Sequence, residues 1–326
     1  MPLHPRHPLS ASRLQITQGP RSAELRLLEL IDKWMKEVRS SPSRLLCPLL
    51  IVVPSKSLRD HLRRRLICHR GAGVVGVEIR TARSLARSIL EKAGRNPREW
   101  PALAVLPLKR HAQKDPEIRD AFGSFEDPHG ALLASVRDLL DAGFLPHQTE
   151  ALEELITQSE LSSTQKKRAL WVVGSAGALE EAIAKILPSP KDIPSAHHEF
   201  STAAALLSPP GGRRALVREP VVLYGFSDAT GCLGDFLEAL TRSHGAVYFE
   251  DHPPNPALRE GLKREAPFME RLPERLRPHT QSAQPQVAPP TGAVELHLVA
   301  ARNVYAEAKA VAQRIREALR KAQGRL

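Results

Sequence analysis

The sequence is poor in cysteine and in aromatic residues, and each scarcity argues against a class of protein. Its three cysteines, Cys47, Cys68 and Cys232, are far apart and form no C-x-x-C pair. This spacing argues against a disulfide framework and a cysteine zinc site, and it favours a reducing compartment. Aromatic residues make up only 4% of the chain, so stacking platforms for single-stranded bases are few.

The chain also lacks long apolar runs and the pattern of a leader. No segment approaches the roughly 18 consecutive apolar residues of a membrane-spanning helix. The N-terminal stretch MPLHPRHPLSASRL carries basic residues but no apolar core, unlike a secretory signal peptide. These absences, together with the cysteine usage, predict a cytoplasmic protein without a membrane partner.

A third absence concerns residues 14–31, LQITQGPRSAELRLLELI, where a strand-like run and a Gly-Pro turn precede an amphipathic helix. A phosphate-binding loop would read G-x-x-x-x-G-K-[ST] at this place. Here Gly19 is followed by Pro20, Arg21 and Ser22, and the second glycine and the lysine are missing. We therefore predict a degenerate nucleotide-binding turn, with neither ATP nor Mg²⁺ as a cofactor.

What the sequence does contain is an excess of positive charge, with 47 basic against 36 acidic residues and a net charge of +11. This balance favours polyanionic partners, because each neutralised phosphate releases counterions. A basic surface that only keeps the protein soluble is the alternative. The helical stretch SLRDHLRRRLICHR is the best candidate for DNA contact. Its basic residues are Arg59, Arg63, Arg64, Arg65 and Arg70. The alternative for this helix is a solvated basic face.

The pattern of strands and helices predicts an α/β protein. The apolar run LLIVVP is typical of a buried parallel strand, and GVVGVEIRT is a second strand-like run. Strands and helices alternate through the first hundred residues, which indicates a parallel sheet. Helical patterns follow, and the α/β pattern returns at REPVVLYGFSD. The predicted segments are the first part of a core (1–95), a helical insertion (96–215), a second part of the core (216–252), a Pro-rich linker (253–290) and the start of a second domain (291–326).

This order of pieces resembles the N-terminal, helicase-like half of the B subunit of AddAB-type ATP-dependent helicase–nucleases, often labelled PD-(D/E)XK nuclease family proteins. The similarity covers nearly the whole chain, from ITQGPRSAELRLLELI through IVVPSKSLRDHLRRRL and VVLYGFSDATGCLGDFLEAL to ARNVYAEAKAVAQRI. The resemblance implies a RecA-like, P-loop-type parallel sheet with degenerate Walker motifs and a large all-helical insertion. It also implies that the chain is a fragment of a longer subunit, whose nuclease domain would lie beyond Leu326.

The resemblance implies further site residues. In active superfamily 1 helicases a strand ending in Asp-Glu holds Mg²⁺, but here Tyr224 and Gly225 occupy those positions. The basic helix corresponds to a region that lies along the single strand in helicases. Thr81 and Arg83 fall at a turn that contacts DNA in the family, although Thr81 alternatively serves only as the N-cap of the next helix.

Together the residues and the resemblance imply a non-catalytic, helicase-like DNA-binding module of an ATP-dependent exonuclease complex in double-strand-break repair and recombination. The expected partners are DNA, in single-stranded form, and a helicase A-type subunit. An active DNA-dependent ATPase with aberrant motifs, or a scaffold that binds only a partner subunit, are the alternatives. We predict no catalytic residue. We also predict no metal site, because the pair His197-His198, followed by Glu199, lacks a third distant ligand.

Overall fold

The computed structural model describes residues 13–18, 20–41, 45–71, 73–97, 105–114, 116, 128–186, 192–193, 195–209, 215–226, 229, 231–242, 246–252, 271–276, 281–282 and 313. The chain divides into two compact units, Met1–Val287 and Ala288–Leu326. Every helix and strand given below belongs to the first unit. The start of a second domain that we predict at 291–326 lies outside the described residues, apart from the helical residue 313.

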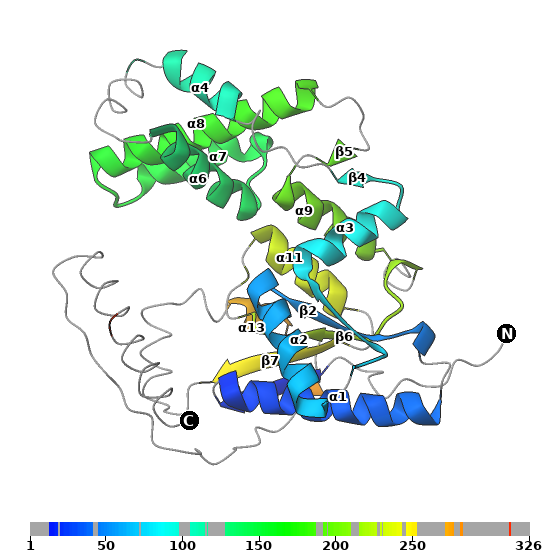
Figure 1. Cartoon of the computed structure of the whole chain (residues 1–326). Helices are drawn as coiled ribbons and strands as arrows, with labels where there is room; N and C mark the ends of the chain where they lie inside the picture. The colour runs from blue at the N-terminus through cyan, green and yellow to red at the C-terminus, as the bar shows by residue number, and fades with distance from the viewer. Residues whose placement is uncertain are drawn as a thin grey trace. The chain divides into compact units, whose positions relative to one another are not determined.

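The first unit is built on a parallel sheet of six strands (Figure 1). Its strands are β1 (Arg13–Gln18), β2 (Leu49–Val53), β3 (Val77–Thr81), β6 (Val221–Leu223), β7 (Ala246–His252) and β8 (Gln281–Ser282). Their order across the sheet is β3-β2-β6-β7-β1-β8, and each pair of neighbours runs parallel. The predicted α/β class is therefore confirmed.

Two helices cover one face of this sheet, α1 (Pro20–Ser40) and α2 (Lys56–Arg70). Alternate residues of β2, namely Leu49, Ile51 and Val53, share a core with the buried sides of both helices. Ser55 begins α2 by accepting a hydrogen bond from the amide of Leu58, which satisfies one of the free donors of the first turn.

The opposite face is covered by α3 (Ala82–Lys92), α9 (Ala196–Leu207), α11 (Gly231–Thr241) and the short α13 (Arg271–Leu276). The remaining β2 residues, Leu50 and Val52, lie in this second core together with Phe236 of α11. The sheet is thus buried on both faces, which is why β2 and β6 consist of uninterrupted apolar residues rather than an alternating pattern.

The segment between α3 and α9 forms a separate helical group. It contains α4 (Val105–Lys114), α6 (Pro128–Asp141), the 3₁₀ turn η2 (Pro146–Gln148), α7 (Thr149–Gln158) and α8 (Ser163–Ile186). These helices bury a core of their own around Leu108, Val136 and Val173. The apolar stretch LWVV, which is short enough for a strand, lies within α8. A two-stranded parallel pair, β4 (Asn96–Pro97) and β5 (Asp192–Ile193), joins the start and the end of the segment.

Two short elements lie within the Pro-rich segment that we predict to be a linker. The helix α13 buries Leu272 and Leu276, which have no exposed surface, and β8 extends the sheet beside β1. Pro273 stands in the first turn of α13, where a proline breaks no helical hydrogen bond. Composition therefore underestimates the order of this segment, because two leucines four residues apart suffice to anchor one helical turn to the core. In the part of the chain that the structure describes, no helix is long and apolar enough to cross a membrane.

Candidate functional site

The two predicted nucleotide-binding segments lie at the same edge of the sheet. The strands β1 and β6 are parallel, so their carboxyl ends point to one edge, and β7 alone separates them. At a spacing of about 4.8 Å per strand the two ends are about 10 Å apart. Ligands of open α/β sheets bind outside the carboxyl ends of the strands. The sheet therefore brings together the positions that a phosphate and its metal ion would need.

The residues present at the end of β1 offer little to a phosphate. Gly19 itself lies outside the described residues. Pro20 and Arg21 open α1 at the surface, and Ser22 is half-buried. The amide hydrogens at a helix N-terminus are what bind an anion, and Pro20 has none. The first lysine of α1 is Lys33, too far along the helix to reach its N-terminus.

Glu24, one turn into α1, places a negative charge near this end of the helix. Its Oε1 accepts a hydrogen bond of 2.6 Å from Nε of Arg65, and its Oε2 lies 2.8 Å from Nε2 of His61. Burial would raise the pKa of Glu24, but the hydrogen bonds from His61 and Arg65 outweigh this effect and lower it. Glu24 is therefore anionic at neutral pH, and it would repel a phosphate bound at this turn.

At the end of β6, where the resemblance predicts the position of a metal-binding carboxylate, the structure has apolar packing. Tyr224 is buried in the core beneath α1 and α2, and its amide donates to the carbonyl of Val52 at 3.0 Å. Gly225 has a φ of +78°, and a Cβ there would overlap the side chain of Leu58. Phe226 is buried in the core of the other face. Tyr224 and Phe226 thus pack in the two cores rather than presenting a surface on which a base could stack.

The polar surface of α2 divides into two parts. One part contacts α1: Arg65 and His61 bind Glu24, and Arg70 and His69 bind Asp32. A hydrogen bond from His69, opposed by burial and aided by the charge of Arg70, lowers the pKa of Asp32. Since α1 and α2 both return antiparallel to the parallel strands, they run side by side in one direction. Glu24 and Asp32, which are eight residues apart on α1, therefore meet His61 and His69, which are eight residues apart on α2.

The other part of α2 faces solvent. Leu62 and Leu66 point into the core, and Arg63 and Arg64 are exposed. Within the part of the chain that the structure describes, Arg63 and Arg64 make no hydrogen bond or ion pair. Arg59 is bound to its neighbour Asp60 at 3.0 Å. Of the five arginines of α2, Arg59, Arg65 and Arg70 are therefore engaged with carboxylates, and two are available to a phosphate.

The predicted contacts at the start of α3 lie apart from α2. The hydroxyl of Thr81 accepts a hydrogen bond from the amide of Ser84, so Thr81 is the N-cap of α3. Nε of Arg83 donates to Glu199 at 2.7 Å, and Arg87 donates to the same carboxylate at 2.9 Å. The side chain of Glu199 has no exposed surface. Because α2 and α3 cover opposite faces of the sheet, Arg83 does not extend the basic surface of α2.

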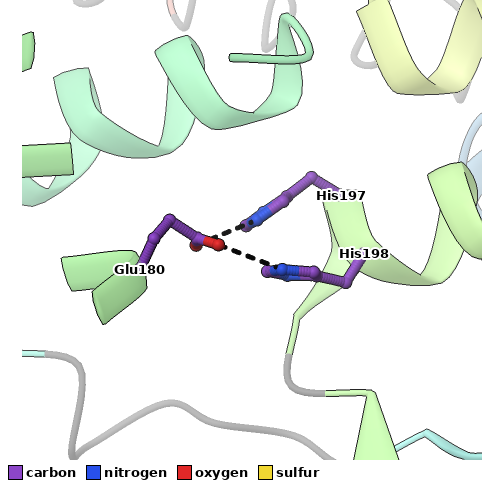
Figure 2. Close-up of side chains that lie close together, drawn as sticks. All are labelled: Glu180, His197 and His198. Carbon is purple, nitrogen blue, oxygen red and sulfur yellow. Dashed lines mark ion pairs between the residues drawn. The ribbon is translucent and has the colours of Figure 1, made fainter. Parts of the chain in front are cut away.

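A group that sequence reasoning missed lies between α8 and α9. The carboxylate of Glu180 lies 3.3 Å from Nε2 of His197 and 3.1 Å from Nε2 of His198 (Figure 2). The histidine pair attracts attention in the sequence, but its neighbour Glu199 points elsewhere, and the partner carboxylate comes from another helix. No local pattern marks Glu180, because only the packing of α8 against α9 defines this contact.

Neither a protein-family model nor a curated protein matches the chain.

Proposed function

We propose that the chain is a non-catalytic, helicase-like DNA-binding module of an ATP-dependent exonuclease complex that acts in double-strand-break repair. In this proposal the fold is a RecA-like sheet with a helical insertion, and a helicase A-type subunit supplies the ATP-driven step. One observation carries the proposal. The two segments at which such an enzyme would bind phosphate and metal share one edge of a parallel sheet, and both carry residues unsuited to that chemistry.

The loss of ATP hydrolysis follows from electrostatics. Phosphoryl transfer depends on cations that neutralise the developing charge. At the end of β1 the chain supplies Glu24 and no nearby lysine, and at the end of β6 it supplies Tyr224 and Gly225 instead of carboxylates. Both failures concern one reaction centre, and each alone would remove an essential cation. We therefore expect no turnover of ATP, with or without DNA.

DNA binding is supported by Arg63 and Arg64 on α2 and by the net charge of +11. Since few aromatic side chains are available to stack on bases, contacts to phosphates would supply most of the affinity. Such binding weakens steeply with salt, because each phosphate contact on a single strand contributes a slope of about −0.7 in log K against log salt.

A salt titration of binding to a fluorescent single-stranded oligonucleotide tests this surface. Arg63→Glu with Arg64→Glu is expected to weaken binding and to reduce the slope by about 1.4, the value for two phosphate contacts. Lys109→Glu with Arg110→Glu is the matched control, since both residues are exposed on α4 and the change in charge is the same. Equal losses in both variants would show a general charge effect and refute the assignment to α2.

The same protein separates the two alternatives. DNA-stimulated release of phosphate from ATP, abolished by a substitution of Arg26 at the start of α1, would replace the proposal by an active ATPase. Wild-type affinity and slope in the Arg63→Glu, Arg64→Glu variant would instead favour a scaffold that binds only a partner subunit.

A further inference from the structure

Glu180, His197 and His198 form a compact cluster of metal-ligand type that does not depend on the proposed function. Glu180 belongs to the C-terminal half of α8, and the two histidines lie in the first turn of α9. The side chains of Glu180 and His197 are each 11% exposed, and that of His198 is 30% exposed. Figure 2 shows both rings directed toward the single carboxylate.

The donor atoms lie close enough together for one ion to draw them into a tetrahedral site. A metal with bonds of about 2.0–2.1 Å holds its ligand atoms about 3.3–3.4 Å from one another. Nε2 of His197 lies 3.3 Å from Oε1 of Glu180, and Nε2 of His198 lies 3.1 Å from Oε2. One ligand atom from each of the three residues lies within 4.8 Å of the other two. A small movement of the side chains would therefore complete the coordination geometry.

The arrangement of the two rings is unusual for neighbours on a helix. Successive side chains of an α-helix diverge by about 100°, and residues i and i+1 do not face each other. His197 and His198 nevertheless reach the same carboxylate, with their ring centroids 4.1 Å apart. Helix geometry alone does not explain this convergence, so the shared partner Glu180, which either contacts both rings directly or binds one ion with them, must account for it.

Ser195 provides the outer contacts that a metal-binding histidine pair needs. It stands at the N-cap of α9, but its hydroxyl makes no capping hydrogen bond. Instead its Oγ lies 2.7 Å from Nδ1 of His198, and it lies 3.0 Å from Nδ1 and 3.3 Å from Nε2 of His197. Metal-ligating histidines typically donate their second ring N–H to such a group, which fixes the tautomer and the orientation of the ring.

The hydrogen-bond inventory explains what a cation would do here. A serine hydroxyl carries one hydrogen and two lone pairs, so Oγ of Ser195 can accept from both Nδ1 atoms. When both rings carry their hydrogen on Nδ1, both Nε2 atoms direct lone pairs toward the carboxylate of Glu180, and a cation between them removes this repulsion. Rings that carry their hydrogen on Nε2 instead donate it to Glu180, so direct contact without metal is the competing state.

We propose that Glu180, His197 and His198 bind one divalent transition-metal ion of the zinc type, through a carboxylate oxygen and both Nε2 atoms. Imidazole and carboxylate ligands suit such ions, whereas Mg²⁺ and Ca²⁺ prefer oxygen alone. Three protein ligands leave the fourth tetrahedral position for water or a further ligand.

The metal would join two separate cores. Near Glu180, Leu179 and Ile183 of α8 lie in the core of the helical group. Ala203 and Leu207 of α9 lie in the core on the sheet. An ion bound by residues of both helices therefore links the helical group to the sheet, and it should stabilise both.

Metal content and thermal stability of the full chain test the proposal. After removal of metal with a chelator, titration with Zn²⁺ should load one equivalent per chain. At free Zn²⁺ about 100-fold above its Kd, the melting temperature should rise by roughly 5 °C, because an ion that binds only the folded state stabilises it by mass action. Co²⁺ in place of Zn²⁺ should give the visible absorption bands of a tetrahedral site. Absence of a stoichiometric equivalent in the wild-type chain would overturn the proposal, whatever the variants do.

Single substitutions locate the ion. His198→Gln and Glu180→Gln should each weaken Zn²⁺ binding by at least about 10–100-fold, since even an outer contact of a metal site is worth that much. His147→Gln is the control, because His147 is an exposed histidine of η2. Circular dichroism verifies that each variant is folded. If the control loses as much affinity as His198→Gln, the ion lies elsewhere and the proposed site is wrong.

Discussion

Arg83 distinguishes a structural role from a DNA-binding role, because the two predict opposite results. Its guanidinium donates to Glu199 at 2.7 Å and 3.3 Å, and Glu199 is completely buried. Hydrogen bonds to charged groups contribute about 1.5–3 kcal/mol each. The side chain of Arg83 is 41% exposed, so solvent screens the interaction. We therefore expect Arg83→Met to lower the free energy of unfolding by about 2 kcal/mol, near the lower limit for one such bond.

The double change Arg83→Met with Arg87→Met should cost more than either change alone. It leaves the carboxylate of Glu199 buried without a cation, a situation that costs about 3–5 kcal/mol. Urea unfolding monitored by circular dichroism measures both variants. The matched control is Arg168→Met on α8, where the arginine is exposed, and it should shift the midpoint little.

DNA affinity is measured on the same variants in buffer without urea, at a temperature well below the unfolding transition. We expect the affinity of Arg83→Met to stay at the wild-type value, since its guanidinium is held by Glu199 on the face of the sheet opposite α2. A stability change near zero together with a loss of DNA affinity would refute this assignment and return Arg83 to the binding surface.

Two further substitutions test a close contact between helices and an ion pair between helices. Gly231→Ala should lower the free energy of unfolding by about 3 kcal/mol, because a Cβ at this positive φ meets the backbone of Asp141. The control Gly71→Ala, at a positive φ in open space, should lower it by only about 1 kcal/mol through backbone strain. Equal losses of the two variants in urea unfolding would show that the contact between α6 and α11 is absent. The pKa of Glu24 is lowered from 4.5, so its contribution to stability is fully present above that pH and is lost as the pH falls through its folded-state pKa. The difference in urea midpoint between wild type and Glu24→Gln should therefore shrink from about pH 6 to about pH 3, and a constant difference would contradict the ion pairs with α2.

The elements that the sequence predicts well are those with complete local signals. The strand β2 is an apolar run closed by Pro54, and α3 lies between the N-cap Thr81 and Gly94, whose φ is +70°. Each of these signals acts over a few residues, so a single sequence suffices. The short elements α13 and β8 carry no such signal, because their stability comes from the core and the sheet that they join.

The candidate site shows the same limit at the level of single side chains. The basic character of α2 is visible in the sequence, but the pairing of Arg65 with Glu24 depends on the neighbouring helix. A signal for this pairing does exist, since the acidic residues Glu24 and Asp32 are eight apart and match the spacing of His61 and His69. It becomes usable only once the strand order places α1 and α2 side by side. The contact of Glu180 with the histidines has no comparable pattern.

On the proposed function, the groups that replace the ATP chemistry have a second consequence. Glu24 stands near the turn where a phosphate would bind, and it holds α2 through Arg65. Leu58 packs over Gly225, where a metal ligand would stand, and it belongs to α2 as well. Glu24 and the packing of Leu58 at Gly225 therefore both hold α2, the helix that presents Arg63 and Arg64, in place. A nucleotide-dependent enzyme needs this edge of the sheet open to its ligand, whereas a surface that binds phosphates in one fixed orientation gains from having the edge filled.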